Sequence, residues 1–247
     1  MIKIKNLKKS FGPKKITNGL DLVVPTHDLM AVIGRSGEGK SVLLKQIIGL
    51  IKPDSGQIFL DEQDTTKLNS KELEDIYKEC GYVFQFAALL DSLTVFENIG
   101  VTLLENNVDP EEVKPLVIEK LRSVGLDEDT LDKYPSELSG GMKKRVGLAR
   151  TLMLSPKILL YDEPTTGLDP ITANIIHELI KKTHTKSSAT SLVVSHDVEI
   201  FKFATSVSML YEGKIAYTGP AKTIWECDNP YVYQFIRGLE DGPIKTK

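Results

Sequence analysis

The chain has 247 residues, enough for one large domain with a full hydrophobic core and too few for two domains of ordinary size. Its net charge of −3, with lysine and arginine spread along the chain, gives no electrostatic support to a general nucleic-acid-binding role. The two cysteines stand outside any CxxC pair or Cys/His cluster, so we expect reduced thiols rather than a disulfide or a metal site.

The chain begins with alternating apolar and polar residues. This pattern covers Ile2–Ile4 and returns over Ile16–Val24, beyond a turn at Phe11-Gly12-Pro13, which predicts a β-hairpin. Leu29–Ile33 is a short continuous apolar run, typical of a strand buried on both faces. Such runs are the longest in the chain, whereas a spanning helix needs ~20 residues, so we expect no membrane-crossing segment.

A glycine-rich loop follows this strand. Gly34-Arg35-Ser36-Gly37-Glu38-Gly39-Lys40-Ser41 matches G-x-x-x-x-G-K-[ST] between a strand and a helix over Ser41 to Leu50. The glycines let backbone N–H groups surround phosphates, and the helix presents its positive end to the same charge. We therefore expect the loop to bind ATP, with Lys40 on the β and γ phosphates and Ser41 on Mg²⁺. A chance match is the alternative, and the strand-helix context argues against it.

In the middle of the chain the predicted strands give way to a long helical segment. Two short strands are predicted at Gln57–Leu60 and Gly81–Phe84. From about residue 94 to 156 no strand pattern is present, which predicts an inserted helical lobe. Its helices begin at the capping box Thr94/Glu97, at Asp109-Pro110 and at Ser139.

An apolar strand ending in two acids comes next, over Lys157-Ile158-Leu159-Leu160-Tyr161-Asp162-Glu163-Pro164. Adjacent carboxylates at the tip of a buried strand are costly unless they act there. We expect Asp162 to hold Mg²⁺, usually through a water, and Glu163 to polarise the attacking water as a general base. The alternative is a strand that merely ends in polar residues. The phosphate loop upstream argues against this alternative.

Strand-helix alternation then resumes. Asp169 caps a helix over Pro170–Lys182, a strand covers Leu192–Ser195, and a Glu212-Gly213 turn joins two further strands. The alternation predicts an α/β fold with a mainly parallel sheet and helices on both faces.

The segment Leu138-Ser139-Gly140-Gly141-Met142 precedes an amphipathic helix, and here the chain resembles the ATP-binding cassette (ABC) ATPases. Their signature reads LSGGQ, and Met142 replaces the usual glutamine. The resemblance implies that Ser139, Gly140 and Gly141 bind the γ-phosphate at a helix N-terminus. A plain helix start is the alternative, but the segment stands after the helical insert and before the acidic strand, as in the family.

This resemblance extends from about Ile2 to Gly219 and implies a P-loop NTPase fold with a small antiparallel β-subdomain. It divides a single domain, 1–240, into a core with the β-subdomain (about 1–93 and 157–225) and a helical subdomain (about 94–156), followed by an extension over 226–247.

Four further positions receive roles from the resemblance. Phe11 stacks on adenine, although a lone Phe near a turn is more often core. Gln85 senses Mg²⁺ and water, Gly167-Leu168-Asp169 touches a partner subunit, and His196 hydrogen-bonds the γ-phosphate. The other histidines lack such a context and are predicted to be surface or structural residues: His27, His177 and His184.

In this family one chain holds half of each catalytic site, so the resemblance implies a second copy, arranged head to tail, as partner. It also implies an integral membrane permease. The apolar residues Phe86, Leu89 and Leu90 follow Gln85, where the family receives a short helix from the membrane subunit. Ordinary packing of the helical lobe is the alternative.

The amino-acid sequences of the segments Ser136–Met142 and Gly167–Thr172 are similar to those of the Mla/Mce-type phospholipid transport ATPases. That resemblance implies transport of phospholipid or a similar lipid between envelope membranes, at the cytoplasmic face of the inner membrane, with a lipid-binding Mce-type protein in the complex. Amino-acid and methionine importer ATPases share most of the motifs and stay as an alternative. A regulatory or nucleic-acid-linked cassette would predict a basic face or a coiled coil, and a P-loop phosphotransferase would lack the signature.

The end of the chain is rich in aromatic and apolar residues: Trp225, Tyr231, Tyr233, Phe235, Ile236 and Leu239. We hypothesise that they pack against the partner subunit, the alternative being that they cover their own domain. The last residues, from Asp241 to Lys247, are expected to fray.

Overall fold

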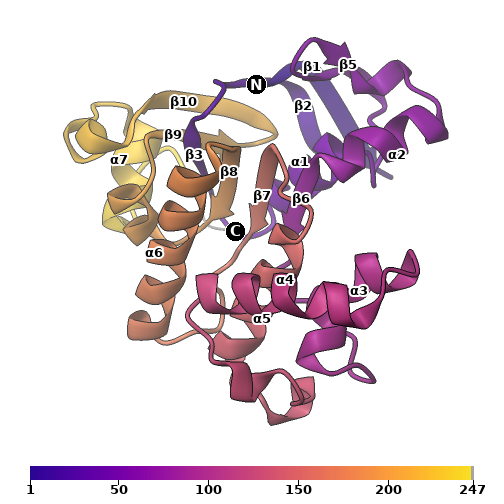
Figure 1. The fold of residues 1–247 in the computed structure, drawn as a ribbon. Helices are drawn as coiled ribbons and strands as arrows, with labels where there is room; N and C mark the ends of the chain where they lie inside the picture. The colour runs from indigo at the N-terminus through magenta and orange to yellow at the C-terminus, as the bar shows by residue number, and fades with distance from the viewer. Residues whose placement is uncertain (246–247) are drawn as a thin grey trace.

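The computed structural model describes residues 1–245, apart from the side chain of Ser70, so the last two residues of the predicted extension lie outside the described residues (Figure 1). Within this range the strands form a six-stranded sheet in the order β10-β9-β3-β8-β7-β6 and a four-stranded sheet in the order β2-β1-β4-β5. The strands are β1 Ile2–Phe11, β2 Lys14–Val24, β3 Leu29–Ile33, β4 Ser55–Leu60, β5 Gln63–Asp64, β6 Cys80–Val83, β7 Ile158–Asp162, β8 Thr190–Ser195, β9 Ser206–Tyr211 and β10 Lys214–Pro220.

The helices cover both faces of the larger sheet, as Figure 1 shows. The α-helices are α1 Lys40–Ile47, α2 Ser70–Lys78, α3 Val95–Glu105, α4 Pro110–Ser123, α5 Gly140–Leu152, α6 Pro170–Ser187 and α7 Pro230–Arg237. Short 3₁₀ helices are η1 Thr65–Lys67, η2 Glu128–Thr130, η3 Pro135–Glu137, η4 Val198–Lys202 and η5 Ala221–Glu226.

The larger sheet is parallel from β9 to β6, and β10 alone joins it antiparallel. Strands β3, β7 and β8 are buried along their whole length, which for β3 confirms the prediction made from its continuous apolar run. Because parallel strands end at the same edge of a sheet, the residues after Ile33, Asp162 and Ser195 come together there.

The smaller sheet is built on the predicted β1–β2 hairpin, which is antiparallel, with β4 on the other side of β1. Its inward side chains share a core with α1 and with one face of the larger sheet. That core fixes α1, and therefore the loop before it, against the sheet edge. The α/β class and the mainly parallel sheet are as predicted.

The helices α3, α4 and α5 lie between β6 and β7 in the chain and pack on one another. The predicted capping box is present, since the Thr94 hydroxyl accepts from Glu97 N and the Glu97 carboxylate accepts from Thr94 N. Val113, Val117 and Leu121 are fully buried on one face of α4. The exact subdomain limits at 94 and 156 stay predictions.

The burial of residues near the C-terminus agrees only in part with the sequence predictions. Ile236 is buried in the core of its own domain, whereas Trp225, Tyr233 and Leu239 are exposed. The predicted fraying is wrong for Ile244, which is buried and held by both its backbone N–H and its C=O to the side chain of Gln234.

Candidate functional site

The glycine loop connects β3 to α1 and requires its glycines. Gly34, Gly37 and Gly39 have φ of 157°, 84° and 96°. A Cβ on Gly34 would lie 2.5 Å from the carbonyl oxygen of Leu210, so a side chain there would displace backbone. Gly39 is the N-cap of α1 and supplies no capping side chain, and the first turn holds no acid. The first N–H groups of α1 are therefore left for an anion.

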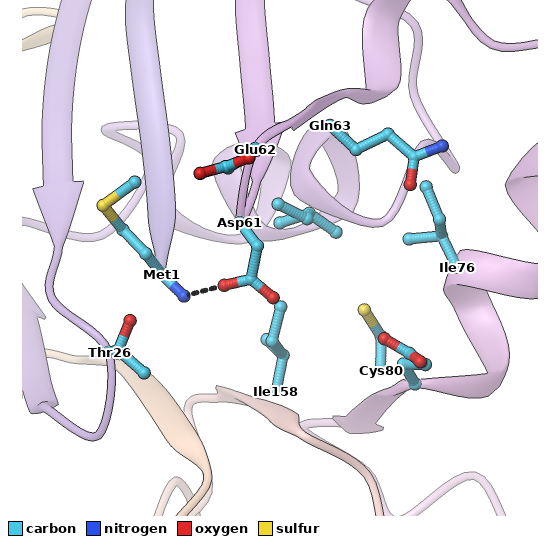
Figure 2. A pocket seen from close by; sticks show the side chains of 10 residues that line it. Met1, Thr26, Asp61, Glu62, Gln63, Ile76, Cys80 and Ile158 are labelled. Atoms are coloured by element: carbon cyan, nitrogen blue, oxygen red, sulfur yellow. Dashed lines mark hydrogen bonds and ion pairs between the residues drawn. The ribbon is translucent and has the colours of Figure 1, made fainter.

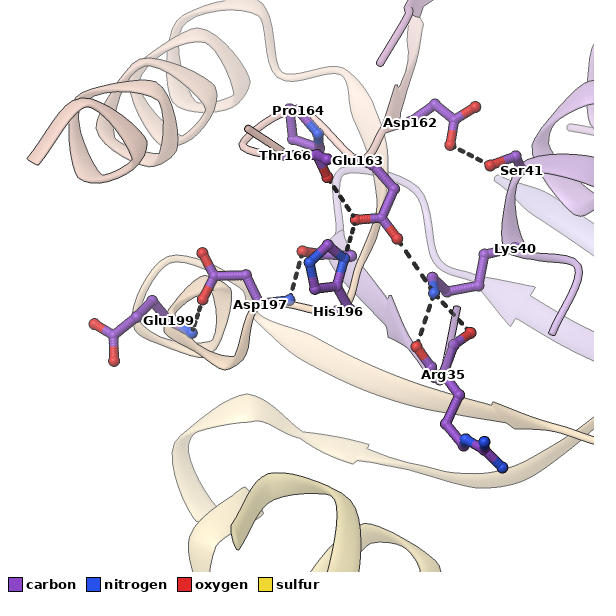
Figure 3. A network of polar contacts seen from close by, with 12 residues as sticks. Arg35, Lys40, Ser41, Asp162, Glu163, Pro164, Thr166, His196, Asp197 and Glu199 are labelled. Atoms are coloured by element: carbon purple, nitrogen blue, oxygen red, sulfur yellow. Dashed lines mark hydrogen bonds and ion pairs between the residues drawn. The ribbon is translucent and has the colours of Figure 1, made fainter. Parts of the chain in front are cut away.

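Lys40 lies at the centre of a polar network (Figure 3). Its side chain is 4% exposed, and its ammonium lies 2.7 Å from the Gly34 oxygen, 3.1 Å from the Arg35 oxygen and 3.2 Å from Glu163 Oε1. The ammonium thus joins the loop to the acidic strand end.

Two loop side chains point away from this network. The Arg35 guanidinium donates to the backbone oxygen of Lys245, and the Glu38 carboxylate accepts from the backbone N–H of Glu212. Within the loop, Arg35 and Glu38 therefore offer an anion their backbone groups rather than their charges.

Asp162 is held by two hydroxyls. Ser41 Oγ donates to Asp162 Oδ1 at 2.6 Å, and the Tyr82 hydroxyl donates to Asp162 Oδ2 at 2.8 Å. Burial, followed by the negative charge of Asp162, raises the pKa of Tyr82, so this hydroxyl stays a protonated donor. Tyr82 was absent from the sequence predictions. The signal available was its place on β6, one residue before the end of a strand that pairs with β7.

Glu163 lies where the predicted residues converge. Its backbone has φ of 48°, a left-handed conformation that is strained for a residue with a side chain. Oε1 faces Lys40, while Oε2 accepts from His196 Nδ1 at 2.6 Å and from the Thr166 hydroxyl at 3.2 Å. The strain places a buried carboxylate between a lysine and a histidine.

A cavity of about 390 Å³ lies over this network. It is lined by the loop, by Gln85 and by Glu163 and His196, with Lys14, Ile16 and Thr166 at other points of its wall. The structure thus brings together residues predicted from four separate segments. Gln85 lies in the wall of the cavity. Asp162 is next to the cavity, since it accepts a hydrogen bond from Ser41, which lines it.

Phe11 and the Ser139–Gly141 segment are outside this cavity. Phe11 is half exposed at the β1–β2 turn, with the Lys9 ammonium 5.4 Å from its ring centre. Ser139 caps α5 and is exposed, and a Cβ on Gly141 would lie 2.5 Å from Thr172 of α6. Asp169 caps α6 as predicted, through the N–H groups of Ile171 and Thr172.

Helix α5 holds two loops of the site through residues that the sequence predictions missed. Lys144 donates to the backbone oxygens of Pro164 and Thr166, just after Glu163. Arg150 donates to the backbone oxygens of Ala87 and Ala88, just after Gln85. The helix that begins with Ser139 is therefore joined to both loops that carry predicted catalytic residues.

A larger cavity, of about 800 Å³, lies elsewhere (Figure 2). It is found where β6 and β7 begin, and Asp61, Glu62 and Cys80 are among its lining residues. Burial raises the pKa of the Cys80 thiol to about 12, which makes it a poor nucleophile. None of the predicted site residues lines this cavity, so size alone would point to the wrong place.

His177 is buried rather than at the surface, and we expect this burial to make the free energy of unfolding depend on pH. Burial lowers its pKa below 6.5, although Asp197 and Glu199 oppose the shift. As pH falls below about 6.5, the unfolded chain binds a proton more readily than the folded one, so the free energy of unfolding falls. We expect the free energy of unfolding to fall less between pH 7.5 and 5.5 in His177→Phe than in the original chain, as measured by urea denaturation. Equal losses would contradict the assignment.

Comparisons with known proteins agree with this geometry. A family model described as ABC transporter matches residues 17–166. A probable ribonucleotide transport ATP-binding protein, mkl of Mycobacterium leprae, is 40% identical over 98% of this chain and 70% of its own length. The intermembrane phospholipid transport system ATP-binding protein MlaF of Haemophilus influenzae is 37% identical over 100% of this chain and 94% of its own.

Two further proteins complete the comparison. A methionine import ATP-binding protein, MetN of Haemophilus ducreyi, is 40% identical over 100% of this chain and 73% of its own. A dimeric structure of a post-hydrolysis state of the ATP-binding cassette MJ0796, bound to ADP and Pi, is 31% identical over 90% of this chain and 99% of its own, with a TM-score of 0.82.

Proposed function

Since this chain belongs to the ABC transporter family, as an ATP-binding and ATP-hydrolysing subunit, we propose that it powers lipid transport between envelope membranes through a separate permease. The observation that carries the catalytic part is the convergence of Lys40, Glu163 and His196 on one cavity. In it, Glu163 takes the proton of the attacking water and His196 contacts the γ-phosphate.

The residues present also fit Mg²⁺. Ser41 and Asp162 place a hydroxyl and a carboxylate oxygen within 2.6 Å of each other, and oxygen ligands of this kind suit Mg²⁺ when phosphate and water supply the rest. When bound, the ion neutralises charge on the phosphates. Tyr82 orients Asp162 for this role, and Gln85 faces the same cavity.

Tyr82→Phe tests this support. The change removes one hydrogen bond to a charged carboxylate and leaves the ring in place. We expect the Mg²⁺ concentration that half-saturates ATP turnover to rise about tenfold, with little change in maximal rate. Turnover is measured across a Mg²⁺ titration, with Tyr217→Phe, on β10, as control. An unchanged half-saturation point would show that Tyr82 does not support the metal.

A second copy of the chain completes each site in this proposal. Ser139 is exposed and lies outside the cavity, so it is available to the nucleotide of a neighbouring subunit. The dimeric ADP-bound relative supports the same arrangement. Among the described residues no helix has both the length and the apolarity needed to cross a bilayer. Phe86 and Leu90, which are 83% and 48% exposed, offer an apolar surface to a membrane permease.

The lipid cargo is supported by the likeness to MlaF over nearly the whole of both chains. We place the subunit at the cytoplasmic face of the inner membrane, with a lipid-binding Mce-type protein in the complex. The likeness to MetN favours the second candidate, an importer of methionine or another amino acid.

Reconstitution separates the two candidates. The chain is isolated from its own cell membranes together with the permease that copurifies with it, and the complex is placed in liposomes that carry fluorescent phospholipid. We expect ATP-dependent transfer of the phospholipid to acceptor vesicles and no uptake of methionine. Methionine uptake without lipid transfer would replace the proposal by the importer.

A further inference from the structure

His177 on α6 is a buried polar side chain without a partner. It is 1% exposed, and neither ring nitrogen has a hydrogen-bond partner among the described residues. Its ring centre lies 5.3 Å from that of Phe203, an apolar neighbour. Most buried polar side-chain atoms have a hydrogen-bond partner, so a buried imidazole that no protein atom satisfies requires an explanation.

The surroundings of His177 adjoin the catalytic residues. The imidazole lines a cavity of about 450 Å³ whose other walls are the segment from Thr165 to Leu168, which follows Glu163, and the segment from His196 to Glu199. The same cavity therefore borders both the loop after the proposed base and the turn that carries the γ-phosphate contact.

Within this cavity Asp197 is the polar group that His177 faces. His177 Nε2 lies 3.9 Å from Asp197 Oδ2, too far for a hydrogen bond and within reach of one after a movement of about 1 Å. Asp197 Oδ1 is already occupied, since it accepts from the backbone N–H of Glu199. The free oxygen is thus the one directed at His177.

Asp197 follows His196 in the same turn and helps to hold that turn. Its backbone N–H donates to Ser195 Oγ at 2.9 Å, and its side chain caps η4, so the turn around His196 is fixed from both sides by Asp197 (Figure 3). His196 itself is engaged with Glu163. This pairing uses Nδ1, so a change in it when nucleotide binds would shift the turn that also carries Asp197.

We propose that His177 is a positioning residue for ATP hydrolysis, whose Nε2–H donates to Asp197 Oδ2 when the turn shifts and so holds His196 on the γ-phosphate. The proposal rests on the proposed catalytic roles of Glu163 and His196 and is independent of the cargo. The bond is absent while His196 pairs with Glu163 and forms in the nucleotide-bound state, which selectively stabilises the state that hydrolyses ATP.

The test compares His177→Phe with His177→Gln, whose amide nitrogen replaces Nε2 as a donor. Turnover is measured on the permease complex in detergent without cargo. We expect His177→Phe to lower kcat about tenfold with the KM for ATP changed less than twofold, and His177→Gln to recover most of the rate. His184→Phe is the matched control, because His184 lies on the same helix but already contacts Ser191 Oγ, and it leaves kcat unchanged.

Asp197→Ser supplies the second arm, since serine keeps a capping oxygen and lacks the second carboxylate oxygen. We expect it to lower kcat as His177→Phe does, and the double variant to fall no further. Additive losses, or an unchanged kcat in a folded His177→Phe, would overturn the proposal. If His177→Phe does not fold, as judged by thermal unfolding, the His177→Gln and Asp197→Ser pair gives the same decision. ATP turnover of Glu163→Gln is measured in parallel. If this variant keeps its turnover, the catalytic assignment of Glu163 fails, and this failure is distinguished from a failure of the role proposed for His177.

Discussion

Glu163→Gln lowers ATP turnover by at least about a hundredfold while ATP binding persists, because the amide cannot take the proton of the attacking water. The substitution keeps the shape of the side chain, and its oxygen can still accept from His196 or Thr166. Binding depends instead on the glycine loop and α1, which are untouched. Turnover is measured by phosphate release and binding by a fluorescent ATP analogue.

The same variant should accumulate as an ATP-bound dimer, because in the proposed head-to-tail pair hydrolysis is the step that releases the two copies. Size-exclusion chromatography with light scattering, with and without ATP and Mg²⁺, measures that mass. Glu62→Gln is the matched control, since Glu62 is an exposed acid in the cavity of about 800 Å³, away from the proposed nucleotide site. Normal turnover in Glu163→Gln would remove Glu163 from the role of general base.

The convergence of the site could be predicted because it follows from the sheet. β3, β7 and β8 are each short and buried along their whole length, and parallel pairing inside a sheet covered on both faces allows this. Polar residues after such strands must then meet at one edge. The contacts of Lys40 and His196 with Glu163 are the outcome of that geometry.

The supporting residues could not be predicted, because nothing local distinguishes them. Tyr82 alternates in its strand like any half-buried residue, and its role appears only when β6 lies beside β7. Lys144 and Arg150 look like the polar face of an amphipathic helix, yet they bind backbone oxygens of two distant loops. His177 falls on the inner face of α6, where an apolar residue would be expected.

Helix α2 and the chain end were missed for a different reason. α2 is strongly polar, so it lacks the apolar periodicity that predicts a helix, although a capping box at Asn69 and Glu72 marks its start. Ile244 is buried through a tertiary clamp by Gln234, which sequence periodicity cannot detect. The exposed positions of Phe11 and Ser139 leave their roles as predictions that require bound nucleotide and a second copy.

Lys40→Ala should be the most damaging single change for nucleotide handling. The ammonium supplies the one side-chain charge that the loop directs at the phosphates, since Arg35 and Glu38 point elsewhere. Its loss lowers turnover by at least about a hundredfold and weakens ATP binding as well, which separates it from Glu163→Gln. Lys45→Ala, on the same helix, is the control, and isothermal titration with ATP and Mg²⁺ measures binding.

The structure adds a consequence for stability. Without Lys40, whose side chain is 4% exposed, the Glu163 carboxylate is left buried beside His196 without its cation. Removing one partner of a buried pair costs about 3 kcal/mol, because the remaining charge is uncompensated. The double variant Lys40→Ala/Glu163→Gln should therefore unfold at higher urea than Lys40→Ala alone, even though both are inactive. If the second substitution restores no stability, the pair does not link the phosphate loop to the acidic strand end in the nucleotide-free protein.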